Sequence, residues 1–353
     1  MFTEAGNFRF DSKCGLPKSR NRNGRDDIRH NRIGTRALLQ RKSWVGGDTL
    51  TYKETTNTLM IKTNVVHIGD PFVLVANGVY YMYATSAPDG FLCRSSLDLV
   101  NWKEEGYCYA NSTWGENCFW APEVFEVDGR YALLYTARWK KNHSLRTGLA
   151  FSDSPKGPFV DAQDGPLFDL GFATIDATFL FDDDGKIYLY FSRDCSEQVI
   201  DGVHVSSIYV SEMKRDLSGL KTEPKLISTP DKPWETSSDP EWWWNEGPAV
   251  IKRGGVYYLN FSANCYASRH YCVACSVAKS PLGPFVKYDD NPVLKYREGD
   301  FSGPGHNSFF RDRDGKLMTA FHVHTNYDAP SGDRRACFAE VKFDGDGKMR
   351  IEV

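Results

Sequence analysis

Acidic side chains stand at the head of four apolar, strand-like segments of this chain. Asp70 lies in HIGDPFVL, Glu123 in FWAPEVFEV, Asp176 in ATIDATFLF and Glu246 in WWNEGPAVI, while a fifth such segment, GPGHNSFF, carries His306 and Asn307. A carboxylate in an apolar strand is costly to bury unless it is paired or has a function. Four acids at similar places therefore favour one shared site over four separate structural roles.

A cluster of carboxyl groups is suited to acid–base chemistry. Repulsion between like charges raises the pKa of one group, so that this group stays protonated and can act as an acid. Glycoside hydrolysis uses such a pair, because two carboxyl groups with separated pKa values flank the scissile bond. The alternative to a catalytic role is that each acid is only a structural hydrogen-bonding partner, which explains a single acid more easily than four.

The acids precede a hairpin pattern that repeats five times. The copies are NGVYYMYATS (77–86), DGRYALLYTAR (128–138), DGKIYLYFSR (184–193), GGVYYLNFSA (254–263) and DGKLMTAFHV (314–323). Asn-Gly, Asp-Gly or Gly-Gly between apolar runs is a strong hairpin signal. Five such units predict an all-β fold, a five-bladed β-propeller over residues 64–353, in which the heads of the innermost strands meet at one end of a channel. A β-sandwich, the main alternative, would not require five similar hairpins.

Composition narrows the classes of partner. The net charge of −3 gives no indication of nucleic acid or of an anionic membrane as a partner, no apolar run approaches the roughly 20 residues of a membrane span, and nothing indicates an oligomeric state. Cys272 and Cys275 form a C-x-x-C, but no second pair stands at the spacing of zinc ligands, so the sequence does not favour a zinc site.

Residues 1–60, rich in Arg, Asn and Gly, are expected to be a basic, flexible N-terminal extension. The start lacks the apolar stretch of a secretory signal, so we expect a cytoplasmic protein as written, or a secreted one if the start is misassigned.

Five short segments carry a resemblance to a known family. GDPFV, FWAPEV, TIDATFLFDDDG, NEGP and GPGHNS, in this order and spacing, resemble glycoside hydrolase family 43, whose five-bladed propellers act on arabinose- and xylose-containing polysaccharides. The resemblance implies that Asp70 is the general base, Glu246 the general acid and Asp176 the carboxylate that orients the acid and tunes its pKa. The family inverts configuration, so base and acid are expected roughly 6.5–9.5 Å apart. The third motif reads Ile-Asp-Ala here, where the family often has Ile-Asp-Pro.

The resemblance also implies residues that contact the sugar. These are Trp120, His306 and Arg334, with Arg335 as the alternative because strand alternation lets only one of the two arginines face inward. Phe72, just after Asp70-Pro71, and Trp244, in the tryptophan run before Glu246, are expected to line the pocket because of these positions. Glu123 is expected to be a structural partner. No cofactor is required, although His306 matches a histidine that in some relatives helps to hold calcium through water near the channel centre. The Asp182-Asp183-Asp184 run is expected to be a solvated hairpin tip.

The expected activity is exo-acting release of α-L-arabinofuranose or β-D-xylose from plant cell-wall oligosaccharides. Insertions at 194–207 and 229–245 favour a closed pocket, while an endo-arabinanase or galactan-active enzyme with the same machinery is the alternative. Fructan-cleaving propellers carry Asn-Asp-Pro and Glu-Cys-Pro, which are absent here. A non-catalytic, sugar-binding propeller is the second class, but such a protein would be expected to have lost one of the three carboxylates.

Overall fold

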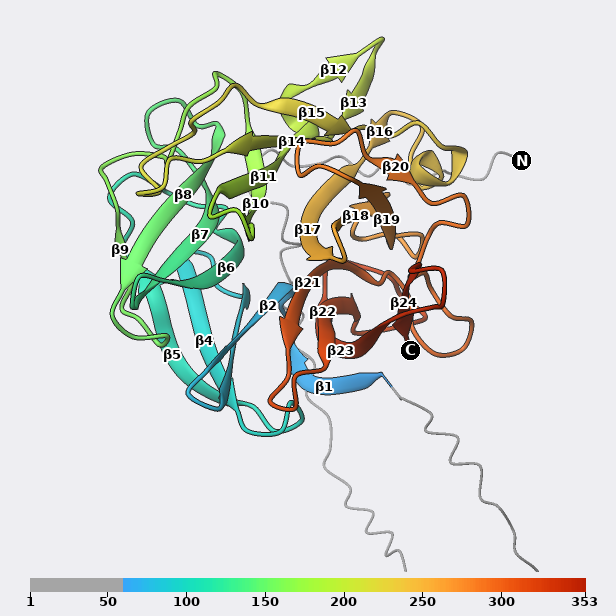
Figure 1. The fold of residues 1–353 in the computed structure, drawn as a ribbon, viewed down its shortest axis with the longest axis horizontal. Helices are drawn as coiled ribbons and strands as arrows, with labels where there is room; N and C mark the ends of the chain where they lie inside the picture. Colours follow the sequence, from blue (N-terminus) through green and yellow to red (C-terminus); the bar gives the residue numbers. More distant parts are fainter. Residues whose placement is uncertain (1–59) are drawn as a thin grey trace, which may run out of the picture. The chain divides into compact units, whose positions relative to one another are not determined.

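The described part of the protein, residues 60–353 of a computed structural model, consists almost entirely of β-strands (Figure 1). These residues form five sheets of four or five antiparallel strands and one small three-stranded sheet. Their helical segments are two short 3-10 helices, η1 (Cys195–Glu197) and η2 (Pro233–Thr236), and no helix in this range is long and apolar enough to cross a membrane. The expected all-β class is confirmed. Residues 1–59 of the expected extension lie outside the described residues.

Four of the five larger sheets are formed from consecutive stretches of the chain. The first contains β2 (Gly69–Ala76), β3 (Val79–Thr85), β4 (Gly90–Ser96) and β5 (Lys103–Ala110). The second contains β6 (Trp120–Val127), β7 (Arg130–Arg138), β8 (Leu145–Ser152) and β9 (Val160–Asp161). The third contains β10 (Thr174–Phe181), β11 (Ile187–Arg193), β14 (Ser207–Glu212) and β15 (Lys225–Ser228). The fourth contains β17 (Asn245–Arg253), β18 (Val256–Ala263), β19 (Cys272–Ala278) and β20 (Val286–Lys287).

The fifth sheet joins the two ends of the described chain. It contains β21 (Gly305–Arg311), β22 (Leu317–His324), β23 (Arg334–Phe343) and β24 (Met349–Glu352), and β1 (Ile61–Val66) pairs antiparallel with β23. Strand β1 therefore begins three residues before the expected start of the domain at residue 64. The small sheet consists of β12 (Val199–Ile200), β13 (Val203–Val205) and β16 (Trp242–Trp243).

The five predicted hairpin turns are of two kinds. Three of them, at Asn77-Gly78, Asp128-Gly129 and Gly254-Gly255, are two-residue turns in which both residues have positive φ, the conformation that matches the twist of paired strands. The turns between β10 and β11 and between β21 and β22 are five residues long. In the last of these, the Asp312 carboxylate accepts hydrogen bonds from two backbone N–H groups of the turn, which stabilises the longer loop.

A β-bulge interrupts the first strand of every large sheet near its start. The pairing register shifts between Gly69 and Phe72, Trp120 and Glu123, Ile175 and Thr178, Glu246 and Ala249, and Gly305 and Ser308. In each bulge the residue after the first named one has positive φ, between 44° and 56°. A bulge with a left-handed residue redirects the side chains around it. The same bulge thus occurs five times, at the strand starts where the acidic residues stand.

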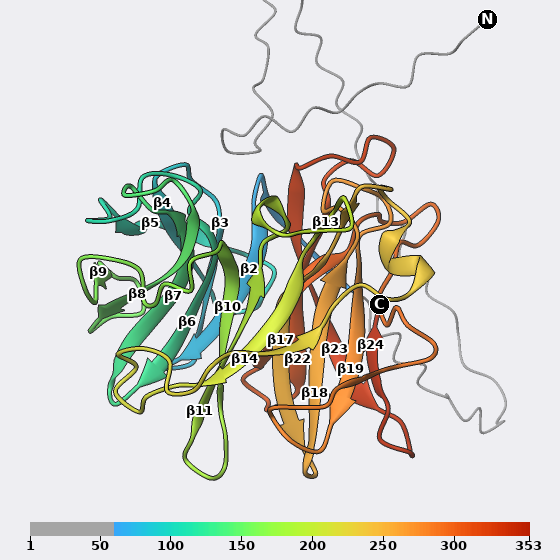
Figure 2. The same cartoon turned by 90° about the horizontal axis from the view of Figure 1, so that it is seen from above.

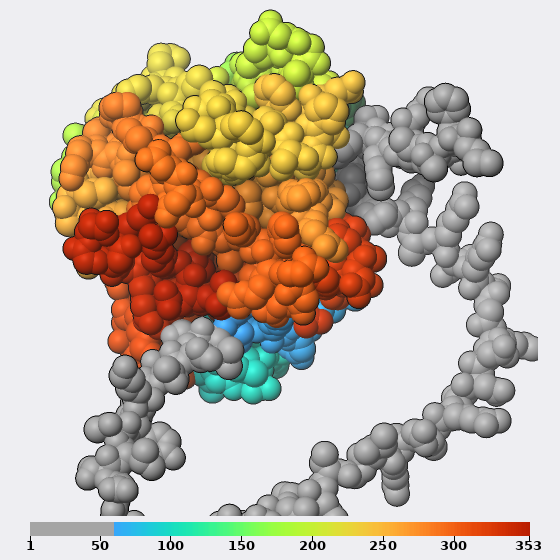
Figure 3. Space-filling view, turned by 90° about the vertical axis from the view of Figure 1, so that its right-hand side faces the viewer, coloured from blue at the N-terminus to red at the C-terminus, as the bar shows by residue number. Residues whose placement is uncertain are grey.

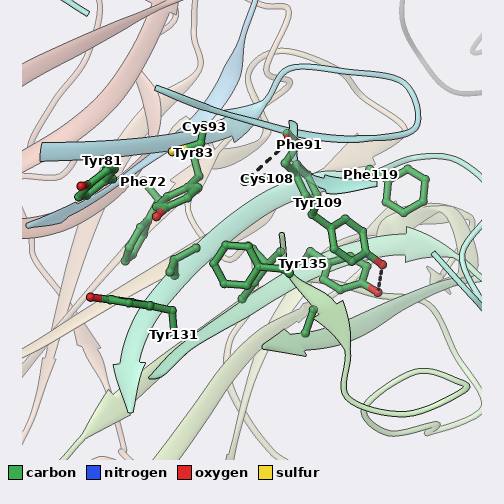
Figure 4. Close-up of a cluster of buried hydrophobic side chains, with 14 of the residues drawn as sticks. Phe72, Tyr81, Tyr83, Phe91, Cys93, Cys108, Tyr109, Phe119, Tyr131 and Tyr135 are labelled. Carbon is green, nitrogen blue, oxygen red and sulfur yellow. Dashed lines mark hydrogen bonds between the residues drawn. The ribbon is translucent and has the colours of Figure 1, made fainter. Parts of the chain in front are cut away.

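These first strands lie next to one another in chain order. Strand β2 contacts β6, β6 contacts β10, β10 contacts β17, β17 contacts β21, and β21 contacts β2. Figure 2 shows β2, β10 and β17 running in a similar direction through the middle of the molecule. Apolar side chains fill the spaces between neighbouring sheets, as in the aromatic cluster around Phe91 and Tyr135 between the first two sheets (Figure 4). Burial of these apolar surfaces is what fixes the strand starts relative to one another.

Candidate active site

Asp70 is the most heavily contacted carboxylate at the bulged strand ends. Arg334 Nη1 donates to its Oδ1 at 2.9 Å, His306 Nδ1 lies 3.3 Å from the same oxygen, and Thr85 Oγ1 donates to Oδ2 at 2.6 Å. Burial alone would raise the pKa of Asp70, but the charges of Arg334 and His306 outweigh it and hold that pKa well below its usual range. Asp70 is therefore ionised throughout the neutral range.

His322 connects Asp70 to the fourth sheet as a neutral ring. Its Nδ1 accepts a hydrogen bond from the backbone N–H of Asp70 at 3.2 Å, which places its proton on Nε2. Burial and the nearby Arg334 lower the pKa of His322 well below the usual value. The ring lies parallel to that of Tyr271, with centroids 5.5 Å apart, and the Tyr271 hydroxyl donates to Glu246 Oε1 at 2.9 Å. A continuous chain of contacts thus joins Asp70 to Glu246.

Glu246 and Asp176 have the opposite tendency to Asp70. Burial, with the nearby charges of Asp194 and Asp70, raises the pKa of Glu246 to about 8. Burial, with the charges of Glu246 and Asp70, likewise raises the pKa of Asp176 to about 8. The N–H of Gly247 donates to Asp176 Oδ2 at 3.1 Å, so the two acids are also tied through the backbone. One cluster therefore holds one ionised and two protonated carboxyl groups near neutral pH.

The strand register corrects one expectation about these acids. Asp70, Asp176 and His306 occupy the same positive-φ position in their bulges, whereas Glu246 stands one residue before that position and Glu123 two residues after it. Three of the five side chains are therefore equivalent, and those of Glu246 and Glu123 are not. Burial raises the pKa of Glu123 to about 8, and its Oε2 has no hydrogen-bond partner in the described structure.

Two glycines make room for the side chains of the site. A Cβ on Gly69 would lie 2.1 Å from the Arg334 guanidinium, and one on Gly305 would lie 2.0 Å from the Tyr271 ring. Both are the first residues of bulged strands and neither has positive φ, so their role is to leave space. A side chain on Gly69 would displace the Arg334 guanidinium, and one on Gly305 would displace the Tyr271 ring.

The remaining expected residues lie at varying depths. Arg334, at the start of β23, reaches Asp70, and its neighbour Arg335 is the half-buried alternative. Trp120 is half-buried at the start of β6, and the next N–H along the chain, that of Ala121, donates to the Thr85 hydroxyl that contacts Asp70. Phe72 lies in the aromatic cluster between the first two sheets, its ring 5.3 Å from that of Phe125 (Figure 4).

One further expectation needs correction, at the other end of β10. Asp182 is not a solvated tip, because its side chain is only 3% exposed, forms an ion pair with Lys252 and accepts a hydrogen bond from the Tyr257 hydroxyl at 2.6 Å. Asp183 and Asp184 are exposed as expected. The first acid of the run anchors the third sheet to the fourth.

Four contributors were not identified from the sequence. Thr85 and His322 come from the second strands of their sheets, Tyr271 directly precedes β19, and Asp194 caps η1 by accepting from the N–H of Ser196 at 3.0 Å. Asp194 is buried, which raises its pKa, and its charge acts on both Glu246 and Asp176. Two of the four carried a signal, since a histidine inside the apolar run TAFHV and an acid closing YFSRD are polar residues in buried strands.

The site does not offer a ready ligand set for a directly bound cation. Within residues 60–353, no group of three or more His, Cys, Asp or Glu side chains is arranged to hold a metal ion. His306 faces Asp70, whose charge is already balanced by the Arg334 guanidinium. The expected water-held calcium at His306 stays a prediction, and no step below depends on it.

Comparison with known proteins identifies the family. The profile described as "Glycosyl hydrolases family 43" matches residues 63–349. The chain belongs to this family. A solved structure described as a thermostable family-43 glycoside hydrolase superimposes with a TM-score of 0.79 at 43% identity, covering 83% of this chain and 95% of that one.

Two relatives of this chain are named for different activities. A β-D-galactofuranosidase (XynD) of Aspergillus niger is 27% identical over 79% of this chain and 81% of its own length. An extracellular exo-α-(1→5)-L-arabinofuranosidase of Streptomyces avermitilis is also 27% identical, over 80% of this chain and 61% of its own length. The family 43 chain described here is accordingly a glycoside hydrolase, and the buried carboxyl cluster is its candidate active site.

Proposed function

We propose that this chain is a five-bladed β-propeller that hydrolyses glycosides with inversion of configuration. The five large sheets support the propeller, since their first strands contact one another in chain order and the last contacts the first. The pairing of β1 with β23 would join the first and last blades. In this architecture the five bulges face one end of a central channel, where the carboxyl groups gather.

The proposed reaction uses Asp70 and Glu246 on opposite sides of the scissile bond. Ionised Asp70 takes a proton from a water molecule as the water oxygen attacks the anomeric carbon. Protonated Glu246 gives its proton to the glycosidic oxygen as that bond breaks, so the leaving sugar departs as a neutral alcohol. One proton enters the protein at Asp70 and one leaves at Glu246, and exchange with solvent restores both groups.

Asp176 is proposed to orient Glu246 and to tune its pKa. Its carboxyl group accepts the N–H of Gly247, the residue that follows Glu246, so it holds the backbone at the acid. The two acids are also coupled, because an ionised Glu246 raises the pKa of Asp176 and so keeps Asp176 protonated.

A single observation carries this proposal: one cluster contains a carboxylate held ionised and a carboxylic acid held protonated. Arg334 and His306 account for the first, and burial beside other acids accounts for the second. Separated pKa values of this kind are what acid–base glycoside hydrolysis requires at neutral pH. A sugar-binding module would gain nothing from burying both groups.

For the substrate, we propose exo-acting release of α-L-arabinofuranose or β-D-xylose. Support comes from the sequence insertions beside the site and from relatives named as an exo-α-(1→5)-L-arabinofuranosidase and a β-xylosidase. A terminal β-D-galactofuranosyl unit is the second candidate, because the Aspergillus niger relative is named for that activity.

The deciding experiment is a panel of 4-nitrophenyl glycosides of α-L-arabinofuranose, β-D-xylose and β-D-galactofuranose. We expect hydrolysis of at least one, with NMR showing that the first-formed sugar has the inverted anomeric configuration. Formation of the retained anomer would contradict the roles given to Asp70 and Glu246. Absence of hydrolysis of all three, and of arabinan and xylan oligosaccharides, would contradict the proposed function.

A further inference from the structure

A small hairpin stands beside the general acid and has no role in the mechanism so far. Strands β12 and β13 form this hairpin, and β13 pairs in parallel with β16, which directly precedes β17 and Glu246. Figure 1 shows the hairpin projecting from the edge of the molecule, and in Figure 3 the yellow-green residues of this region stand out at the top of the surface. Its tip exposes two apolar side chains, Val199 at 58% and Ile200 at 50%.

A row of nearly parallel rings leads inward from this hairpin. The His204 ring on β13 stacks on the Trp242 ring on β16, with centroids 3.7 Å apart and planes 2° apart. The Trp242 ring is in turn 6.4 Å from that of Trp244, with planes 22° apart. His204 and Trp242 are half-buried, while Trp244 is only 6% exposed. The row thus runs from the surface to a buried end.

The buried end of the row lies at the general acid. Side chains alternate along an extended segment, so Trp242, Trp244 and Glu246 share one face. Cys195 provides an independent link, because it interacts with the Trp244 side chain and with the charge of Glu246, and its carbonyl oxygen lies 2.9 Å from His204 Nδ1. The opposite face of the segment carries Asn245, which is engaged by Ser228 and Glu235.

We propose that the half-buried rings of His204 and Trp242, packed onto the buried Trp244, form the platform for the sugar on the leaving-group side of the scissile bond. This inference rests on the proposed function, in which Glu246 protonates the glycosidic oxygen. The leaving sugar is bonded to that oxygen, so it must lie beside Glu246, and Trp242 and His204 are the accessible part of the aromatic row that extends from there. Flat apolar rings suit the C–H face of a sugar. The substrate class is accordingly an oligosaccharide chain rather than a glycoside with a small alcohol.

The test compares two substrates of the sugar identified by the nitrophenyl panel: a trisaccharide, such as α-(1→5)-L-arabinotriose or xylotriose, and the corresponding methyl glycoside. Only the trisaccharide has a leaving sugar. We expect Trp242→Ala to lower the ratio of kcat/KM for the trisaccharide to that for the methyl glycoside by about tenfold, a loss typical of one aromatic contact. Trp242→Phe, which keeps a ring, should retain most of the ratio, and His204→Ala should shift it in the same direction as Trp242→Ala.

Phe181→Ala is the matched control. Phe181 is an aromatic residue, 43% exposed, at the last position of β10, whereas Asp176 stands near the start of that strand. The control should leave the ratio unchanged. A ratio unchanged in both Trp242→Ala and His204→Ala would overturn the platform while the wild-type activity left the proposed function intact. Wild-type protein inactive on both substrates would overturn the proposed function itself.

Discussion

The hydroxyl of Tyr271 donates a hydrogen bond of 2.9 Å to Oε1 of Glu246. Tyr271 is fully buried and its ring lies parallel to His322, whose Nδ1 accepts the N–H of Asp70. The proposed acid and the proposed base are therefore positioned by one set of contacts that joins the first, fourth and fifth sheets. A change in this set should alter both groups together, which makes it a useful place to probe the site.

The pH dependence of kcat/KM should have an alkaline limb near pH 8. Burial and the neighbouring acids raise the pKa of Glu246 to about 8, so the group is protonated below that pH and loses its proton above it. An ionised Glu246 cannot donate to the leaving oxygen, so the rate should fall as the pH rises through this value. Rates measured from pH 4 to 10 on the preferred glycoside test this, and a rate that kept rising to pH 10 would contradict it.

Asp70 should contribute no acid limb in the same range. Its pKa is held well below the usual value, so it remains ionised at about pH 4, where an ordinary aspartate is about half protonated. Removal of the cation by Arg334→Met should raise the pKa of Asp70 and introduce an acid limb. An unchanged acid side in this variant would argue against control of Asp70 by Arg334.

Glu246→Ala should discriminate between leaving groups. On oligosaccharides, whose leaving alcohol needs a proton, we expect kcat/KM to fall by about 10²–10⁴-fold, the usual contribution of a general acid. On 2,4-dinitrophenyl glycosides the leaving group departs without a proton, so the loss should be much smaller. Steady-state kinetics on the two substrate types give the comparison, and equal losses on both would remove Glu246 from the acid role.

Asp70→Asn should separate turnover from binding. The amide keeps the shape of the side chain but is not basic, so kcat should fall by about 10³-fold. Calorimetric titration with an unhydrolysed oligosaccharide should give an affinity near that of the wild type, since the change leaves the aromatic surfaces intact. Wild-type turnover in this variant would contradict the assignment of the base.

Much of this site could be predicted because its chemistry lies at repeated places in the chain. Asp70, Asp176 and Glu246 each precede a recognisable hairpin, and Arg334 follows from the family resemblance, whereas strand alternation alone left Arg334 and Arg335 open. The hairpin pattern did not predict the bulges at the strand starts. It therefore did not show that Glu246 and Glu123 stand outside the bulge position that Asp70 and Asp176 share. Bulges are defined by pairing with a second strand, and sequence spacing alone does not report that pairing.

The supporting contacts were less predictable for a related reason. His322, on β22, reaches Asp70 from another sheet, and Tyr271, directly before β19, reaches Glu246 across its own sheet, so neither contact is local in the sequence. Thr85 reaches Asp70 from the other strand of the β2–β3 hairpin. The long turns at 182–186 and 312–316 also departed from the two-residue pattern, because an aspartate at the head of each turn takes part in hydrogen bonds that hold the longer loop. Local sequence signals identify such turns but do not fix their length.

Gly305→Ala should disturb the site through Tyr271. The added Cβ would lie 2.0 Å from the Tyr271 ring, so the ring must move, and the hydrogen bond to Glu246 must change with it. We expect a loss in kcat of about 100-fold, since a displacement of about 1 Å at a catalytic group has effects of this size. Gly345→Ala is the control, because nothing lies within 4 Å of its Cβ position. Full activity of Gly305→Ala would show that Tyr271 does not position the acid.

Lys287 should prove important for stability and for the backbone before the acid. It pairs at 2.6 Å with Glu235, whose side chain is fully buried and whose Oε1 also accepts from Asn245 at 3.0 Å. Lys287→Met would leave a buried carboxylate without its cation, which should lower the free energy of unfolding by about 3 kcal/mol. Activity should fall as well, because Asn245 directly precedes Glu246.

The matched control for this change is Lys186→Met, which breaks a pair with Asp184 in which both side chains are nearly half exposed. Water and salt already screen that pair, so urea denaturation should show no measurable change. The comparison separates the loss of any lysine from the loss of a buried partner. Equal stability of the two variants would mean that Glu235 is held by its backbone and amide donors alone, and that Lys287 does not secure the start of β17.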